Sequence, residues 1–86
     1  MLKSKTLDMG GINRTDFIAY FLKIGGHTDD QATFKGSYWE VMVGSEYFAK
    51  LGSFSIKRIL ITFKVEEDRF DEFMARFTMS FLRAGG

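Results

Sequence analysis

The feature that most constrains this chain is a phenylalanine-rich stripe near its carboxyl end. In residues 66–83, EEDRFDEFMARFTMSFLR, an apolar side chain recurs every three or four positions. The stripe consists of Phe70, Phe73, Met74, Phe77 and Phe81. This spacing places all of these side chains on one face of an α-helix. The first turn is acidic and Arg76 and Arg83 lie toward the end, as the helix dipole favours. Such a face has to pack against another element.

A second amphipathic segment lies near the amino end, in residues 13–24, NRTDFIAYFLKI. Its apolar positions follow a helical period and are Phe17, Ile18, Phe21, Leu22 and Ile24. We expect Asn13 to cap the free amide groups of the first turn, with Asp16 close to the geometry of a capping box. Gly25 then supplies the left-handed conformation that ends the helix.

Between the two helices, apolar and polar side chains alternate, as they do in strands. Residues 37–43, SYWEVMV, form a strand in which one face is more apolar than the other. That face carries Trp39, Val41 and Val43. Residues 32–35 are the preceding strand of a hairpin that turns at Gly36 and Ser37.

The longest strand is predicted in residues 54–65, FSIKRILITFKV, and its apolar side chains change face partway. One face carries Ile59, Ile61, Phe63 and Val65. Phe54 and Ile56 have the opposite parity, and a continuous strand cannot send both sets to the same side. Either a bulge lies near Lys57 and Arg58 or both faces of the sheet are covered at that end, and we favour the bulge.

The order of the predicted elements defines the fold class. Residues 3–8 form an opening strand, and residues 46–51 form a short strand that turns at Gly52 and Ser53. The order is therefore strand, helix, four strands, helix. An α+β fold with two helices packed on one face of a curved antiparallel sheet buries both Phe-rich faces. At this length we expect a single domain over residues 1–86.

Composition excludes several classes of protein. The chain has no cysteine, which rules out disulfides and thiolate metal sites. Its 12 Lys and Arg against 11 Asp and Glu give a net charge of +1, so nucleic acid is an unlikely partner. No apolar run reaches the ~18 residues that a membrane span needs. The amino terminus also lacks the apolar region of a signal peptide, and we expect a cytoplasmic protein with no membrane partner.

Three local strings, together with the order of elements, point to a known family. They are IGGHT at residues 24–28, KLGSFSI at residues 50–56, and the acidic start of the last helix, which leads to a glycine-rich terminus. The chain resembles the carboxyl-terminal domain of MoaD-related proteins, which are related to the small subunit of molybdopterin synthase. The resemblance runs over nearly the whole chain. It implies a β-α-β(4)-α arrangement similar to that of the TATA-binding protein.

The resemblance also carries expectations about function. In fused members a ubiquitin-like sulfur carrier precedes this domain and has its own Gly-Gly at the junction, whereas here we expect no carrier because the chain begins at Met1. The resemblance implies a link to sulfur-carrier or molybdopterin (Mo/W) cofactor assembly. It supplies no catalytic residues, and the fold by itself does not imply DNA binding.

The string FLRAGG at residues 81–86 is one candidate site. A free Gly-Gly carboxylate is the group at which sulfur carriers are activated, so Gly85 and Gly86 form a candidate carrier tail. The string FLKIGG at residues 21–26 has the same pattern inside the chain, where no free carboxylate exists. We therefore favour helix termination over a carrier tail.

His27, followed by Asp29 and Asp30, is a candidate metal site or general base. No second His or Cys supports a metal ion, and adjacent Asp side chains are typical of turns. The sequence suggests no nucleophile for His27 to activate. We therefore predict a loop that binds neither metal nor cofactor and has no catalytic residue.

The strands hold an aromatic cluster, which is Phe34, Tyr38, Trp39, Tyr47, Phe48 and Phe54. If one face of the sheet is open, these rings are exposed or bind a partner, although packing within the chain is the interpretation that we favour. RNA binding is disfavoured because Glu40 shares a face with Tyr38 and the net charge is near neutral. A symmetric dimer through that face would cover the rings.

Cations form the last candidate surface. Lys57 and Arg58 are a candidate anion contact if they lie on a bulge. Together with Lys50 and Lys64, they are more typical of edge cations that prevent another chain from adding a strand.

These observations favour a small non-catalytic binding or protein-interaction module rather than an enzyme. Its expected partner is a second copy of the chain, in a homo-oligomer, or a sulfur-carrier or cofactor-assembly protein. Trp39 and the neighbouring rings would form the contact. Two alternatives stay open: a sulfur-carrier-like protein activated at Gly86, and an enzyme or metal site around His27.

Overall fold

Five strands and two helices follow the predicted order. The computed structural model describes the backbone of residues 1–85 and the side chains of residues 1–81. The elements are β1 (Leu2–Gly10), α1 (Arg14–Lys23), β2 (Thr33–Lys35), β3 (Trp39–Val43), β4 (Tyr47–Leu51), β5 (Phe54–Glu66), a 3-10 turn η1 (Glu67–Arg69) and α2 (Phe70–Gly85). The α+β class and the strand, helix, four-strand, helix order are confirmed.

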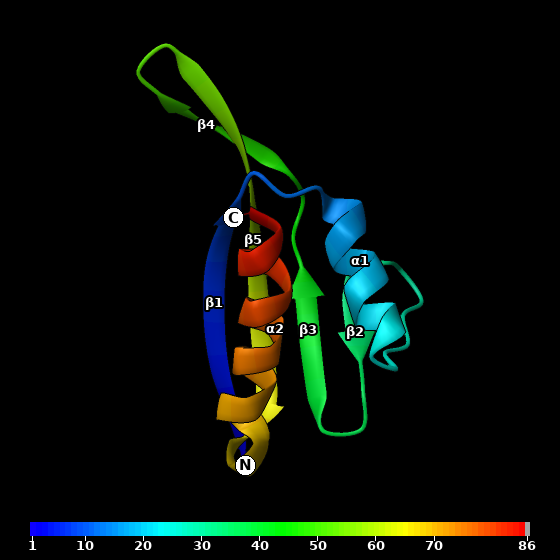
Figure 1. Ribbon diagram of the computed structural model, residues 1–86. Coiled ribbons are helices and arrows are strands. Elements are labelled where there is room, and N and C mark those ends of the chain that lie inside the picture. The colour runs from blue at the N-terminus through cyan, green and yellow to red at the C-terminus, as the bar shows by residue number, and fades with distance from the viewer. Residues whose placement is uncertain (86) are drawn as a thin grey trace.

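One open antiparallel sheet forms the layer behind the helices. Its strand order is β1-β5-β3-β2, and β4 pairs with the first residues of β5. β1 pairs with β5 from Leu2↔Glu66 to Gly10↔Arg58, and β3 pairs with β5 on the other side. Both helices lie on the same face of this sheet, as predicted (Figure 1).

The core lies between the helices and the sheet and is rich in phenylalanine. The predicted stripe of α2 is buried along its whole length, at Phe70, Phe73, Met74, Phe77 and Phe81. Phe77 lies at its centre, with its ring centroid 4.9 Å from that of Phe63 on β5 and 5.8 Å from that of Phe21 on α1. The predicted inward faces of β3 and β5 are buried as well.

The first helix buries a narrower face than its sequence pattern predicts. Phe17 and Phe21 are fully buried, whereas Leu22 is 48% exposed and Ile24 is 38% exposed. The ring of Phe17 lies 4.7 Å from that of Phe81, centroid to centroid. The buried face of α1 is therefore the i, i+4 pair that meets α2 and the sheet.

One end of α1 matches the prediction and the other does not. Asn13 is the N-cap residue, but its side chain makes no capping hydrogen bond. Its Oδ1 instead accepts a hydrogen bond from Lys57 Nζ at 2.9 Å. At the other end, Gly25 has a φ of +98°. The N–H of Gly26 donates to the carbonyl oxygen of Phe21 at 2.9 Å, the closing bond of a Schellman motif, so the glycine stop is confirmed.

The predicted bulge at Lys57 and Arg58 is wrong. The pairing of β5 with β4 runs through both residues in one register. The extra residue lies instead in the segment between β3 and β4, which runs opposite β5. The β3–β5 and β4–β5 registers differ by one, so residues 45–46 together stand opposite Ile59 alone. β5 can therefore continue as one strand past the end of the core.

The other face of the sheet carries mostly polar side chains. The hydroxyl oxygens of Thr6 and Thr62 lie 3.1 Å apart on neighbouring strands. Glu40 and Lys64 are cross-strand partners on the same face. Leu60, 48% exposed, is one of its few large apolar side chains. Where this face lies behind the core, it therefore carries none of the six predicted rings.

Candidate interaction site

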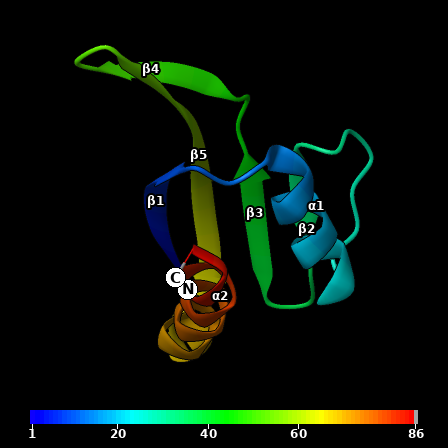
Figure 2. The same cartoon turned by 45° about the horizontal axis from the view of Figure 1, so that its top comes forward.

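The β4–β5 hairpin projects from the molecule. Figures 1 and 2 show it extending past the helices, away from the two-layer body. Its paired positions run from Tyr47↔Arg58 to Leu51↔Phe54. Gly52 turns the chain with a φ of +64°, at the predicted turn. Because a two-stranded hairpin is only marginally stable in water, contacts at its base have to hold it in place.

The tip of the hairpin exposes large apolar side chains. Leu51 and Phe54 are direct cross-strand partners and are 66% and 73% exposed. Phe48, on the opposite face of the hairpin, is 67% exposed. The apolar residues at the start of β5 therefore change face because this part of the strand lies outside the core. Neither of the two predicted explanations, a bulge or a doubly covered sheet, applies.

Arg14, the first residue of α1, anchors one side of the hairpin base. Its guanidinium donates to three backbone carbonyl oxygens, those of Gln31 (2.7 Å), Gly44 (2.9 Å) and Val43 (3.2 Å). Its backbone N–H donates to Glu46 Oε2 at 3.1 Å. This hydrogen bond lowers the pKa of Glu46, and Lys57 lowers it further. The segment that leads into β4 is thereby tied to the start of α1.

A second polar group ties the hairpin to β1. The Tyr47 hydroxyl donates to Asp8 Oδ2 at 2.8 Å, and Arg58 Nε donates to Asp8 Oδ1 at 3.0 Å. The hydrogen bond from Tyr47 lowers the pKa of Asp8 below its ordinary value, and Arg58 lowers it further. The same hydrogen bond raises the pKa of Tyr47. Both strands of the hairpin are therefore held at the base, which preorganises its tip.

The geometry does not support Lys57 and Arg58 as an anion contact. Lys57 Nζ lies 3.5 Å from Glu46 Oε2, and Arg58 Nε lies 3.0 Å from Asp8 Oδ1. The bulge on which the prediction depended is absent, and each cation already faces a carboxylate of the chain. These two residues form ion pairs that hold the base of the hairpin instead.

The six rings predicted to form one interaction face do not lie together. Phe34 is fully buried and Trp39 is 5% exposed, so the predicted protein-interaction face centred on Trp39 is wrong. Tyr38 is half-buried, and the guanidinium of Arg69 lies 4.7 Å from its ring centroid. The rings that lie on the hairpin are Tyr47, Phe48 and Phe54.

The loop that contains His27 is held by its own hydrogen bonds. His27 and Lys35 exchange two backbone hydrogen bonds, both of 2.9 Å. Asp30 Oδ1 accepts from the N–H groups of Thr33 and Ala32, both at 2.9 Å, and these bonds lower the pKa of Asp30. Asp30 is therefore a turn-forming residue. Among the residues that the structure describes, no group of three His, Cys, Asp or Glu side chains is placed to hold a metal ion.

The carboxyl-terminal string continues the last helix. α2 runs from Phe70 through Gly85, so Gly85 is helical rather than part of an extended tail. Gly86 lies outside the described residues. To use Gly85 and Gly86 as a carrier tail, the last turn of α2 would have to unwind.

Sequence reasoning missed two surface features. The first is Leu51, whose position directly across the Gly52 turn from Phe54 was the available signal. The second is a hollow between the helices that is flanked by Arg69 and Arg76. Their i, i+7 spacing indicates one shared helix face, but nothing in the sequence indicates what lies opposite.

The fold and its surface define a small two-layer α+β domain with a preorganised apolar hairpin. None of the described helices is long and apolar enough to cross a membrane. The chain belongs to the archaeal MoaD-like protein family, whose family profile matches residues 5–86. The MoaD-related resemblance seen in the sequence is thereby confirmed. Comparison with curated proteins gives no match.

Proposed function

We propose that this protein is a non-catalytic interaction module of the cytoplasm that is accessory to sulfur-carrier or molybdopterin cofactor assembly. Membership of the MoaD-like family supports the link to that process. The projecting hairpin supports the binding role. The order β-α-β(4)-α further supports a TATA-binding-protein-like arrangement of the sheet and its helices.

One observation carries the proposal: a hairpin that is fixed at its base exposes Leu51 and Phe54 at its tip and Phe48 on its other face. These side chains are 67%, 66% and 73% exposed. Full burial of each by a partner is worth about 1.5–3 kcal/mol. Because the Arg14 and Asp8 groups already hold the hairpin, binding does not have to order it first.

Charge indicates what kind of partner fits. Residues 47–58 contain three cations and no acid. Two of these, Lys57 and Arg58, face carboxylates at the base, whereas Lys50 near the tip makes no ion pair among the described residues. A two-fold contact between hairpins would bring two copies of Lys50 into one interface. We therefore propose a different protein as the partner, one with an apolar cleft that is rimmed by acidic side chains.

Calorimetric titration tests the proposal. The probe is the purified ubiquitin-like sulfur carrier of the same organism, titrated into the wild-type chain and into the triple variant Phe48→Ser/Leu51→Ser/Phe54→Ser. We expect the triple variant to weaken binding at least 100-fold, because all three anchors are lost together. The matched control is Leu60→Ser, which removes a half-exposed leucine from the open sheet face. It should change the affinity less than twofold.

Further measurements on the wild type, the triple variant and the control show which results would contradict the proposal. Thermal midpoints of the triple variant and the control should match the wild type closely, because the changed side chains are exposed. No binding of the carrier, or equal binding by the triple variant, would overturn the proposal. Light scattering that shows a wild-type dimer disrupted by the triple variant would replace the proposed partner with a second copy of the chain.

A further inference from the structure

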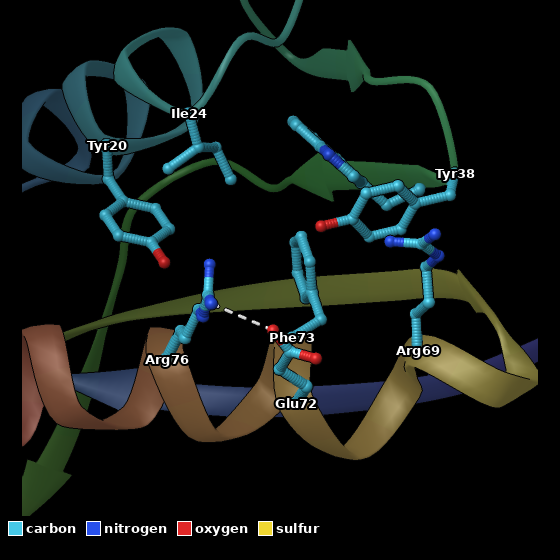
Figure 3. A pocket seen from close by; sticks show the side chains of 8 residues that line it. Tyr20, Ile24, Tyr38, Arg69, Glu72, Phe73 and Arg76 are labelled. Atoms are coloured by element: carbon cyan, nitrogen blue, oxygen red, sulfur yellow. Dashed lines mark ion pairs between the residues drawn. The ribbon is translucent and has the colours of Figure 1, made fainter.

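A hollow of about 280 Å³ lies between the carboxyl end of α1 and the first half of α2. Its lining residues are Tyr20, Ile24, Tyr38, Trp39, Arg69, Glu72, Phe73 and Arg76 (Figure 3). Small-molecule sites commonly measure about 300–1,000 Å³. This hollow is just below that range, which suits a ligand of one ring and a few attached atoms.

The inner wall of the hollow is aromatic. The ring centroids of Trp39 and Phe73 lie 5.4 Å apart. Tyr38 meets Phe73 edge to face, with centroids 6.3 Å apart and planes at 88°. Aromatic rings favour further rings in stacked or edge-to-face contact. A planar ring is therefore the group that this wall accommodates best.

The rim of the hollow is positively charged. Arg69 and Arg76 are seven residues apart, which corresponds to about 10 Å along a helix axis. Arg69 makes no ion pair among the described residues, and its guanidinium rests on the ring of Tyr38. Arg76 pairs with Glu72 at 2.9 Å, but both side chains are more than two-thirds exposed, at 74% and 68%. Because water screens such a pair, a bound anion can replace Glu72 as the partner of Arg76.

Hydroxyl groups add uncharged donors at both ends of the hollow. Figure 3 shows the Tyr20 hydroxyl directed toward Arg76 and the Tyr38 hydroxyl directed into the space above Phe73. A tyrosine hydroxyl is already uncharged at neutral pH, and burial raises the pKa of Tyr20 further. An adjoining hollow that shares Tyr38 is lined by His27 and Lys35. The neighbourhood therefore favours an anionic ligand.

We propose that this hollow binds a small molecule with one planar ring and one anionic group, a phosphate or a carboxylate. The ring lies against Phe73 and Trp39, and the anion accepts hydrogen bonds from Arg69 and the Tyr38 hydroxyl. Arg76, released from Glu72, is the second cationic contact. The hairpin plays no part in this site, so the inference and the proposed function can fail independently.

Trp39 provides a direct reporter, because it is the single tryptophan of the chain and lines the hollow. Its emission and the cross-peak of its indole N–H in a ¹H–¹⁵N spectrum are followed during titration with four probes. These are phenyl phosphate, benzoate, inorganic phosphate and benzyl alcohol. We expect phenyl phosphate or benzoate to bind at least tenfold more tightly than either inorganic phosphate or benzyl alcohol. The tighter of the two aromatic anions identifies the anionic group, and added salt should weaken its binding.

Three variants and a control then locate the charge contacts. Arg69→Gln should weaken binding of the tighter aromatic anion at least tenfold, and Arg76→Gln about threefold, since a charge-assisted hydrogen bond is lost in each case. Glu72→Gln should strengthen binding, because it frees Arg76 and removes a like charge from the ligand. Lys64→Gln, which removes a cation from the opposite sheet face, should leave the affinity within twofold.

Several results would overturn the inference. The first is no response of Trp39 to either aromatic anion at 10 mM, a concentration at which a site with a Kd of about 1 mM would be about 90% occupied. Equal binding of benzyl alcohol would remove the anionic contact, and equal binding of inorganic phosphate would remove the ring contact. An effect of Lys64→Gln as large as that of Arg69→Gln would mean that the probe responds to net charge rather than to this hollow.

Discussion

Replacing Gly36 with alanine tests how tightly the ring of Trp39 is held. A Cβ built on Gly36 lies 2.2 Å from both Nε1 and Cε2 of Trp39. A Cβ built on Gly26 lies 2.6 Å from Cη2 of the same ring. Both glycines therefore lie directly against the indole, where a side chain on either would clash with it. The rings of Phe21 and Phe73 lie 5.8 Å and 5.4 Å from it, centroid to centroid, and oppose a shift of the indole into the core.

The magnitude follows from the distance that has to be gained. Ordinary contact begins at 3.4 Å, so the ring or the Gly36 backbone must move by 3.4 − 2.2 = 1.2 Å. Overpacking of this kind costs about 1–3 kcal/mol. Folding stability for a chain of this length is about 4–13 kcal/mol at the usual ~0.05–0.15 kcal/mol per residue. With a urea slope of about 1 kcal/mol per molar, the unfolding midpoint should fall by about 1–3 M.

Urea unfolding followed by Trp39 emission and by far-UV circular dichroism measures this change. The control is Ser37→Ala, in the same turn, whose exposed side chain should change the free energy of unfolding by less than about 0.5 kcal/mol. The sign is decisive, because a Gly→Ala change without a clash stabilises a protein by about 0.4–1 kcal/mol through the unfolded chain. A midpoint that stays equal or rises in Gly36→Ala would refute the account of Trp39 as an enclosed core residue.

Two further predictions concern the hairpin base. Arg14→Gln removes the donors to three carbonyl oxygens, so the free energy of unfolding should fall by about 1–3 kcal/mol, and amide exchange in β4 should accelerate more than in β3. Asp8 has a lowered pKa in the folded chain, so its contribution is present above its unfolded pKa of about 3.9 and is lost as the pH falls through the folded value. Urea midpoints measured between pH 7 and pH 2 should therefore fall less steeply below pH 4 in Asp8→Asn than in the wild type.

The element order and most of the core could be predicted, because the spacing of apolar side chains along the sequence is enough to identify a buried face. Phe77 and Ile59 each lie on a regular stripe, and both are fully buried. The same reasoning failed at Phe54 and Ile56, because it assumes that the chain covers its own apolar residues. A hairpin that extends past the core violates that assumption. The register shift that sets its direction lies at residues 45–46, where no sequence pattern marks it.

The candidate site was predicted least well because it depends on contacts between distant segments. Tryptophan is a residue type that is common at interfaces, which favoured a surface role for Trp39. The side chain is buried instead, because Gly26 and Gly36 leave room for its ring. Lys57 and Arg58 look like free cations until β1 and the start of α1 bring Asp8 and Glu46 beside them. Charge partners of this kind become visible only once the strands are paired.

The two Gly-Gly pairs of this chain show why a shared string does not imply a shared role. In FLKIGG, Gly25 ends α1 with a φ of +98°, and Gly26 lies against Trp39, where any side chain would clash. The role of Gly26 depends on Trp39, which lies outside the string FLKIGG, so the string alone does not determine that role. The backbone of α2 is helical through Gly85, which by itself differs from the left-handed stop at Gly25. The internal copy therefore explains one way to end a helix, and it is no evidence against activation at Gly86. Mass analysis after incubation with an adenylating enzyme, ATP and a sulfide donor decides that alternative, because sulfide would displace AMP from an adenylated Gly86 carboxylate and leave a thiocarboxylate.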